Sequence, residues 1–130
     1  VISSIANFCN PIQDLIVVLG CGGNRDQGKR PIMGKIAFQN SSKVVFTSDN
    51  PRCENPISII DDMCFDLPDA PFNKVHKIPN RKEAIHFACN HTSKGTVILV
   101  AGKGHEKFQE INGERIPFDD FNILTNILKT

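Results

Sequence analysis

The fold is decided by the stretch Lys43-Val-Val-Phe-Thr-Ser-Asp-Asn-Pro-Arg52. Its first half is a short apolar run rich in β-branched residues, which predicts a buried strand. Its second half is a polar turn, and Pro56 beyond it suits the first turn of a helix. The turn at residues 48–52 is therefore expected to leave the carboxyl end of a strand, and ligands of open α/β sheets bind at that edge.

The side chains of this turn match the two charges of a zwitterion. Asp49 offers a carboxylate for an ammonium group, and Asn50 offers an amide with donors and an acceptor. Arg52 offers a rigid fork of donors that matches a carboxylate or a phosphate, while Pro51 fixes the backbone between them. The alternative interpretation is an Asx-turn with a surface ion pair, because Asp, Asn and Pro are ordinary turn residues.

Composition limits the class of protein. The chain has 130 residues, a net charge of +1, 40% hydrophobic and 22% charged residues, which predicts one globular, soluble domain. The small net charge gives no reason to expect nucleic-acid or membrane binding, and no apolar run approaches the length of a membrane span. The Cys count of 5 is odd, and the cysteines lack paired C-x-x-C spacing. We therefore expect a cytoplasmic protein without disulfides or structural zinc.

Apolar runs alternate with helical patterns along the chain. Strands are expected over residues 14–19, 43–47, 74–78 and 96–100. Helices are expected over residues 1–9, from Pro31, from Ile57 to about Met63, between Asn80 and Gly95, and after the capping residue Asp119. Asn112-Gly113 predicts a hairpin. The predicted fold class is α/β: a Rossmann-like, mostly parallel sheet flanked by helices, with a C-terminal β-hairpin and helix.

Helical spacing also predicts which side chains face the core. For the helix from Pro31 these are Ile32, Ile36 and Ala37. For the helix from Ile57 they are Ile57, Ile60 and Cys64.

Three polar loops with glycine or proline, at residues 20–30, 48–52 and 102–106, follow expected strands. Because the carboxyl ends of parallel strands lie on one edge of a sheet, we expect the three loops to meet there.

The first loop is Gly20-Cys-Gly-Gly-Asn-Arg-Asp-Gln-Gly-Lys-Arg30. It matches the P-loop spacing up to Lys29, but Arg30 stands where a Ser or Thr hydroxyl is required, so a standard P-loop is excluded. Its glycines and the charges of Arg25, Lys29 and Arg30 suit an anion. The alternative is a flexible turn with solvated charges.

The third loop follows Ala101 and reads Gly102-Lys-Gly-His-Glu106. Glu106 is the expected acceptor for a substrate ammonium group, and His105 is expected to be a structural donor. No catalytic residue and no metal site is predicted in this chain, since the remaining histidines lack ligand spacing. Cys21 and Cys53 are expected to be packing residues near the site.

Three motifs in this order and spacing carry a family resemblance: Gly20-Cys-Gly-Gly-Asn-Arg-Asp-Gln-Gly-Lys-Arg-Pro-Ile-Met-Gly34, Thr47-Ser-Asp-Asn-Pro-Arg52 and Ala101-Gly-Lys-Gly-His-Glu106. They resemble the C-terminal domain of the Mur ligase family over nearly the whole chain. The closest type is MurE, and the Asp-Asn-Pro-Arg form resembles the enzymes that add meso-diaminopimelate rather than those that add lysine. Asn24 departs from the family pattern, which usually has Asp.

The resemblance implies an ATP-dependent, Mg²⁺-requiring ligase of peptidoglycan precursor synthesis. In such a ligase ATP phosphorylates the D-glutamate carboxylate of UDP-MurNAc-L-Ala-D-Glu, and the amine of meso-diaminopimelate attacks the acyl phosphate. By resemblance, Arg25 binds one carboxylate of diaminopimelate, and the turn after the second strand binds its far end. The implied set of binding residues is Arg25, Asp49, Asn50, Pro51, Arg52, Gly102 and Glu106.

The resemblance also implies a division of labour between domains. Residues 1–130 are expected to be the amino-acid-binding domain, with ATP and Mg²⁺ held mainly by a central domain and the nucleotide precursor by an N-terminal one. We expect this chain to be a fragment without the first strand of its domain, inactive by itself. The alternatives are a non-catalytic anion- or nucleotide-binding α/β module and a related Mur ligase that adds another amino acid, such as L-lysine.

Overall fold

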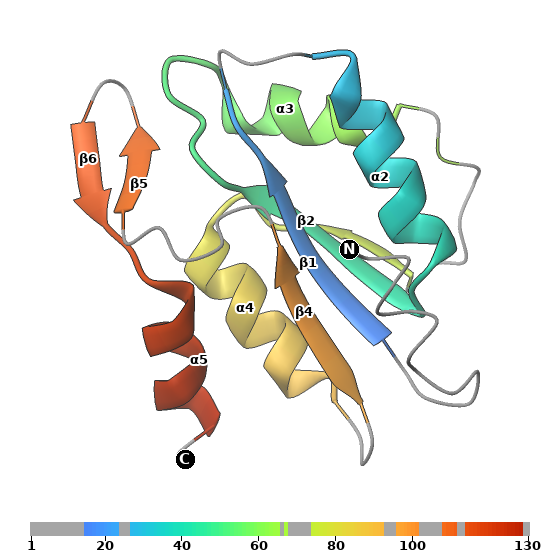
Figure 1. Ribbon diagram of the computed structural model, residues 1–130, viewed down its shortest axis with the longest axis vertical. Helices are drawn as coiled ribbons and strands as arrows, with labels where there is room; N and C mark the ends of the chain where they lie inside the picture. Colours follow the sequence, from blue (N-terminus) through green and yellow to red (C-terminus); the bar gives the residue numbers. More distant parts are fainter. Residues whose placement is uncertain are drawn as a thin grey trace.

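The computed structural model describes residues 15–23, 27–65, 67, 74–92, 96–101, 108–111 and 114–128. The helix expected over residues 1–9 lies outside these ranges. The elements are β1 (Leu15–Cys21), α2 (Lys29–Gln39), β2 (Lys43–Ser48), α3 (Pro56–Met63), β3 (Val75–Lys77), α4 (Arg81–Asn90), β4 (Val97–Ala101), β5 (Phe108–Ile111), β6 (Glu114–Pro117) and α5 (Asp120–Leu128) (Figure 1). The predicted α/β class, the parallel strands and the C-terminal hairpin and helix are confirmed.

The main sheet of the described residues has the strand order β3-β2-β1-β4, and all its pairs are parallel. β1 is buried along its whole length, as expected for an apolar run covered on both faces. The chain adds β2 and β3 on one side of β1 and then crosses to add β4 on the other side. This reversal creates a switch point between β1 and β4, and open α/β sheets bind ligands in the crevice at such a point.

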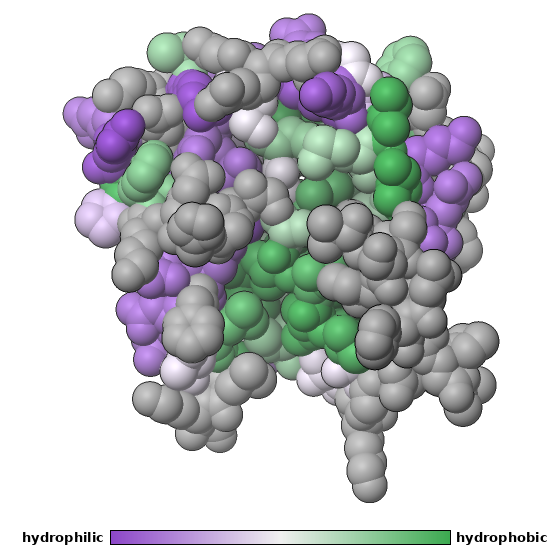
Figure 2. Space-filling model, in the orientation of Figure 1, coloured by the Kyte–Doolittle hydropathy of each residue, from purple (hydrophilic) through white to green (hydrophobic). Residues whose placement is uncertain are grey.

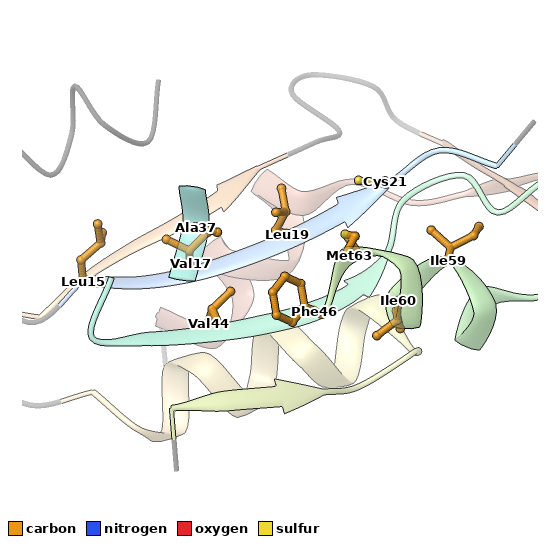
Figure 3. Close-up of a cluster of buried hydrophobic side chains, with 10 residues drawn as sticks. All are labelled: Leu15, Val17, Leu19, Cys21, Ala37, Val44, Phe46, Ile59, Ile60 and Met63. Carbon is orange, nitrogen blue, oxygen red and sulfur yellow. The ribbon is translucent and has the colours of Figure 1, made fainter. Parts of the chain in front are cut away.

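Two layers of helices cover the sheet, because alternate residues of a strand point to opposite faces. On one face the odd-numbered residues of β1 pack with Ala37 of α2 and with Ile59, Ile60 and Met63 of α3 (Figure 3). On the other face Ile16 and Val18 pack with α4, and residues of α5 extend this second cluster. The helices therefore fix the sheet from both sides.

β4 is one of the two edge strands of this sheet, and every one of its residues is only half-buried. In Figure 2 hydrophobic side chains gather at the middle of the molecule's face, where Figure 1 draws β1 and β4, with hydrophilic residues around them. No helix of the described residues is long and apolar enough to cross a membrane.

The helix caps follow the predicted chemistry. The Asn80 side chain accepts a hydrogen bond from the Glu83 amide at 3.0 Å and begins α4. Asp119 accepts one from the Asn122 amide at 3.3 Å and begins α5. These bonds satisfy amide groups that have no partner within their own helix.

The inward face of α2 differs from the prediction. Ile32 and Ile36 are 60% and 38% exposed, whereas Ala37 is buried as expected. The buried positions are Arg30, Gly34 and Ala37, a helical stripe that starts with a charged residue. A Cβ at Gly34 would lie 1.9 Å from the Met63 carbonyl oxygen, so glycine allows α2 to approach α3 closely. An apolar pattern cannot reveal a stripe made of arginine and glycine.

The prediction for α3 was correct at two positions of three. Ile60 is buried and Cys64 is half-buried against the core cluster, whereas Ile57 is 57% exposed. Ile59 and Met63 complete the buried face instead. The helix begins one residue earlier than expected, because the Asn55 side chain caps it and Pro56 occupies its first turn.

Candidate functional site

The turn after β2 is buried rather than solvated. Asp49 and Asn50 are 8% and 3% exposed. Arg52 has a φ of 54°, the only positive φ of a non-glycine residue in the described part of the chain. That conformation costs about 1–2 kcal/mol for a residue with a Cβ, and such strain tends to cluster at ligand sites. The burial contradicts the surface position in the alternative of an Asx-turn with a surface ion pair, since the Asp49 carboxylate is not on the surface.

The first loop contacts this turn directly. The Gly23 amide donates a hydrogen bond to the Asn50 carbonyl at 2.7 Å. Arg52 Nη1 donates to the carbonyls of Gly23 at 2.9 Å and Asn50 at 3.4 Å. A Cβ at residue 23 would lie 1.9 Å from the Pro51 carbonyl oxygen, so only glycine fits. The predicted meeting of the first two loops is confirmed.

The third loop, at residues 102–106, lies outside the described residues, but the strand before it ends at the same edge. Ala101 ends β4, and its carbonyl accepts a hydrogen bond from Arg81 at 3.3 Å. Arg81 also donates to the Ser48 carbonyl, which ends β2, at 3.1 Å. Farther along the chain, Ile111 at the end of β5 forms a parallel bridge with Arg52. The turn after β2 thus lies close to the end of β4 and contacts the hairpin strand that follows the third loop.

Of the expected binding residues, the structure brings Asp49, Asn50, Pro51 and Arg52 together in one turn. Arg25, Gly102 and Glu106 lie outside the described residues, and their roles remain predictions.

The environment of Arg30 differs from the prediction that its charge helps to bind an anion. It is 1% exposed, and its Nη1 lies 2.9 Å from Asp62 Oδ2. Its Nη2 lies 3.0 Å from Glu54 Oε1 and 3.1 Å from the Gly22 carbonyl. Burial alone would lower the pKa of this guanidinium, but the hydrogen bonds with Glu54 and Asp62 outweigh it and raise the pKa. Arg30 therefore holds the first loop against α3 and is not available to a phosphate.

Arg81 is the residue that sequence analysis missed. It is 1% exposed, and besides the two carbonyls it binds Asp120 through Nε at 2.8 Å and Nη2 at 2.7 Å. Its sequence setting, just after a helix cap, is that of an ordinary surface arginine. Only its burial reveals that it joins the ends of β2 and β4 to the start of α5.

The cysteines near the site have different environments. Cys21 is buried against Met33 as expected, and burial raises the pKa of its thiol to about 11. Burial likewise raises the pKa of Cys64 to about 11. Cys53 is exposed, so the expectation that it packs is wrong.

We predict that a disulfide reagent at pH 8 modifies Cys53 at least tenfold faster than Cys21 or Cys64. The thiolate is the reacting form, and the two raised pKa values leave about a hundredfold less of it than an ordinary thiol has. The measurement is peptide mass mapping over time, with Cys53→Ser as the control. Equal labelling of Cys21 and Cys53 in the folded protein would contradict the burial.

Two of the described histidines, His76 and His91, pack against Phe87, with ring centroids 4.6 Å and 4.0 Å from the centroid of its ring. His86 is exposed. Within the described ranges no group of three or more His, Cys, Asp or Glu side chains could hold a metal ion.

Comparison with known proteins places this geometry in a family. Residues 1–104 match the family described as "Mur ligase, glutamate ligase domain". The chain belongs to the Mur ligase family. The resemblance noted from the three motifs is thereby confirmed.

Among the relatives of this Mur ligase chain are two bacterial proteins named UDP-N-acetylmuramoyl-L-alanyl-D-glutamate--2,6-diaminopimelate ligase. The protein of Bacteroides thetaiotaomicron is 54% identical over 113 residues, which cover 87% of this chain and 23% of that protein. The protein of Listeria monocytogenes serotype 4b is 51% identical over 120 residues, which cover 92% and 24%.

A solved structure of a ligase of the same name superimposes with a TM-score of 0.88 at 38% identity, and covers 98% of this chain and 26% of the other. The chain thus spans about a quarter of the length of the relatives it matches.

Proposed function

We propose that the complete protein is an ATP-dependent ligase that adds meso-diaminopimelate to UDP-MurNAc-L-Ala-D-Glu, and that residues 1–130 form its amino-acid-binding domain. The names of the relatives support this substrate pair, and the chain aligns with them over most of its length. Within the chain, the observation that carries the proposal is the buried turn Asp49-Asn50-Pro51-Arg52, joined to the first loop beside the switch point of the sheet.

The chemistry of this turn suits one end of diaminopimelate. That end bears an ammonium group and a carboxylate, and lysine lacks the second carboxylate. A carboxylate at Asp49 and a guanidinium at Arg52 are the complementary groups for such an end. Arg25, Gly102 and Glu106 are proposed to complete the site, because their loops leave the neighbouring strands β1 and β4.

The proposed contribution of this domain to catalysis is positioning. Charged hydrogen bonds at both ends of the amino acid would hold its reacting amine in line with the activated carboxylate, which converts a bimolecular encounter into an oriented one. The backbone hydrogen bond between Gly23 and Asn50 and the bonds from the Arg52 guanidinium to the carbonyls of both residues support this role, since they make the turn rigid before the ligand binds.

The first loop does not fit the phosphates of ATP. A P-loop needs a Ser or Thr hydroxyl after its lysine, and here Arg30 stands in that place, buried against Glu54 and Asp62. We therefore assign ATP and Mg²⁺ to the parts of the protein outside this chain.

The cytoplasm is the proposed place of action. Cys21, Cys53, Cys64 and Cys89 are free thiols, as is common for proteins of reducing compartments.

A ligation assay tests the proposed function. The complete protein is incubated with ATP, Mg²⁺ and UDP-MurNAc-L-Ala-D-Glu, and with either meso-diaminopimelate or L-lysine, and the product is identified by mass. We expect the diaminopimelate product at a kcat/KM at least 100-fold above that for lysine. Equal use of lysine would contradict the assigned substrate, and no product with either amino acid would overturn the proposal.

A further inference from the structure

We infer that Arg81, oriented by Asp120, is a positioning residue that fixes the carboxyl ends of β2 and β4, and thereby the position of Asp49 and the affinity for diaminopimelate. This inference rests on the proposed function. It concerns a buried side chain that contacts the backbone just before Asp49.

The hydrogen bonds of Arg81 end where the proposed binding loops begin. Nη1 donates to the carbonyl of Ser48 at 3.1 Å, and the next residue is Asp49. Nη2 donates to the carbonyl of Ala101 at 3.3 Å, and the next residue is Gly102. β2 and β4 do not pair with each other, since β1 lies between them. One guanidinium therefore joins the ends of two separated strands.

Asp120 fixes the direction of these bonds. Its two carboxylate oxygens lie 2.8 Å from Nε and 2.7 Å from Nη2 of Arg81. Arg81 and Asp120 are 1% and 6% exposed, so water screens the pair little. A planar guanidinium held on two nitrogens cannot rotate, and Nη1 must point at Ser48.

Gly20 supplies an independent constraint on the same peptide group. A Cβ at Gly20 would lie 2.6 Å from the Asp49 nitrogen and 3.0 Å from the Ser48 carbonyl oxygen. The peptide between Ser48 and Asp49 thus lies against the backbone of β1. Arg81 holds its oxygen, and the position of Asp49 follows from both contacts.

Because Arg81 is buried, it positions other residues and does not bind the substrate directly. The donors of Arg81 point at carbonyl oxygens and at Asp120, and its 1% exposure leaves no surface for a substrate. Arg81 makes no contact with the ligand itself, but its loss would displace Asp49, which is proposed to bind the ligand. A displacement of about 1 Å can cost an enzyme about 100-fold in efficiency, and a displaced binding residue should raise the KM for diaminopimelate.

The experiment compares Arg81→Lys and Asp120→Asn with Ile85→Val in the complete ligase. Lysine keeps the charge but lacks the planar fork, and asparagine keeps the shape of aspartate but loses one acceptor. Ile85 is a fully buried residue on the same helix whose packing is with the second core cluster, so its substitution controls for lost stability. KM is measured for all three substrates, together with Tm and the preference for diaminopimelate over lysine.

We expect Arg81→Lys to raise the KM for diaminopimelate by about 10-fold or more and Asp120→Asn by about 3-fold or more, with the KM for ATP and for the nucleotide precursor within 2-fold. Ile85→Val should leave all three KM values unchanged while it lowers Tm. A uniform rise of the three KM values, or an equal rise with Ile85→Val, would overturn the inference. If Arg81→Lys does not fold, the KM values of the isosteric variant Asp120→Asn alone test the inference. The proposed function fails separately, when the unsubstituted protein does not use diaminopimelate.

Discussion

Arg52→Ala is expected to abolish the preference of the complete ligase for meso-diaminopimelate over L-lysine. A charged hydrogen bond in a site with little water contributes about 2–3 kcal/mol, and lysine has no second carboxylate to make it. The kcat/KM for diaminopimelate should therefore fall by about 30- to 150-fold, and that for lysine should change little. The measurement is the ratio of the two kcat/KM values.

The matched control for this prediction is Arg52→Gly. Both variants lack the guanidinium, but only glycine adopts the φ of 54° without strain. We expect the same loss of preference in both, with the glycine variant more stable by about 1 kcal/mol. If the preference survives in either variant, Arg52 does not bind the distal carboxylate.

Arg81→Met is expected to destabilise the isolated chain by about 3–5 kcal/mol, because it leaves the Asp120 carboxylate buried without its partner. The double variant Arg81→Met with Asp120→Leu should recover at least half of this loss, since it removes both charges and keeps apolar volume. The free energy of unfolding in urea, measured for both single variants and the double variant, gives the coupling.

A loss below about 1 kcal/mol for Arg81→Met would contradict a buried pair and indicate a solvated one. If the double variant recovers no stability, the loss in Arg81→Met comes mainly from the hydrogen bonds to the carbonyls of Ser48 and Ala101 rather than from the unpaired Asp120.

The fold could be predicted because its helices and strands are specified by residues that are close together in the sequence. The residues of β1 form a continuous apolar run, and the caps Asn80 and Asp119 stand at the starts of their helices. Strands buried on both faces and capped helices are signals that need no knowledge of distant residues. The alternation of these signals predicted a parallel sheet, and the motifs at its carboxyl edge predicted the family.

The buried ion pairs that hold the site in place could not be predicted, because each joins residues that are far apart in the sequence. Arg81 and Asp120 are 39 positions apart, and Arg30 and Asp62 are 32 apart. Each arginine occupies a helix position that a pattern of apolar residues assigns to solvent. Gly34 is likewise required because it packs against the Met63 backbone, which belongs to another helix.

A ligand with acid groups at both ends is proposed to bind where the first loop meets the turn after β2. Titration of the ¹⁵N-labelled chain with meso-diaminopimelate, followed by the backbone amide resonances, tests this proposal most directly. We expect shifts at Gly23, Asn50 and Arg52 with meso-diaminopimelate, and much smaller shifts with L-lysine. Equal shifts with both amino acids, or shifts confined to the cavity of about 460 Å³ that Lys82, His86 and Asn122 line between α4 and α5, would contradict it.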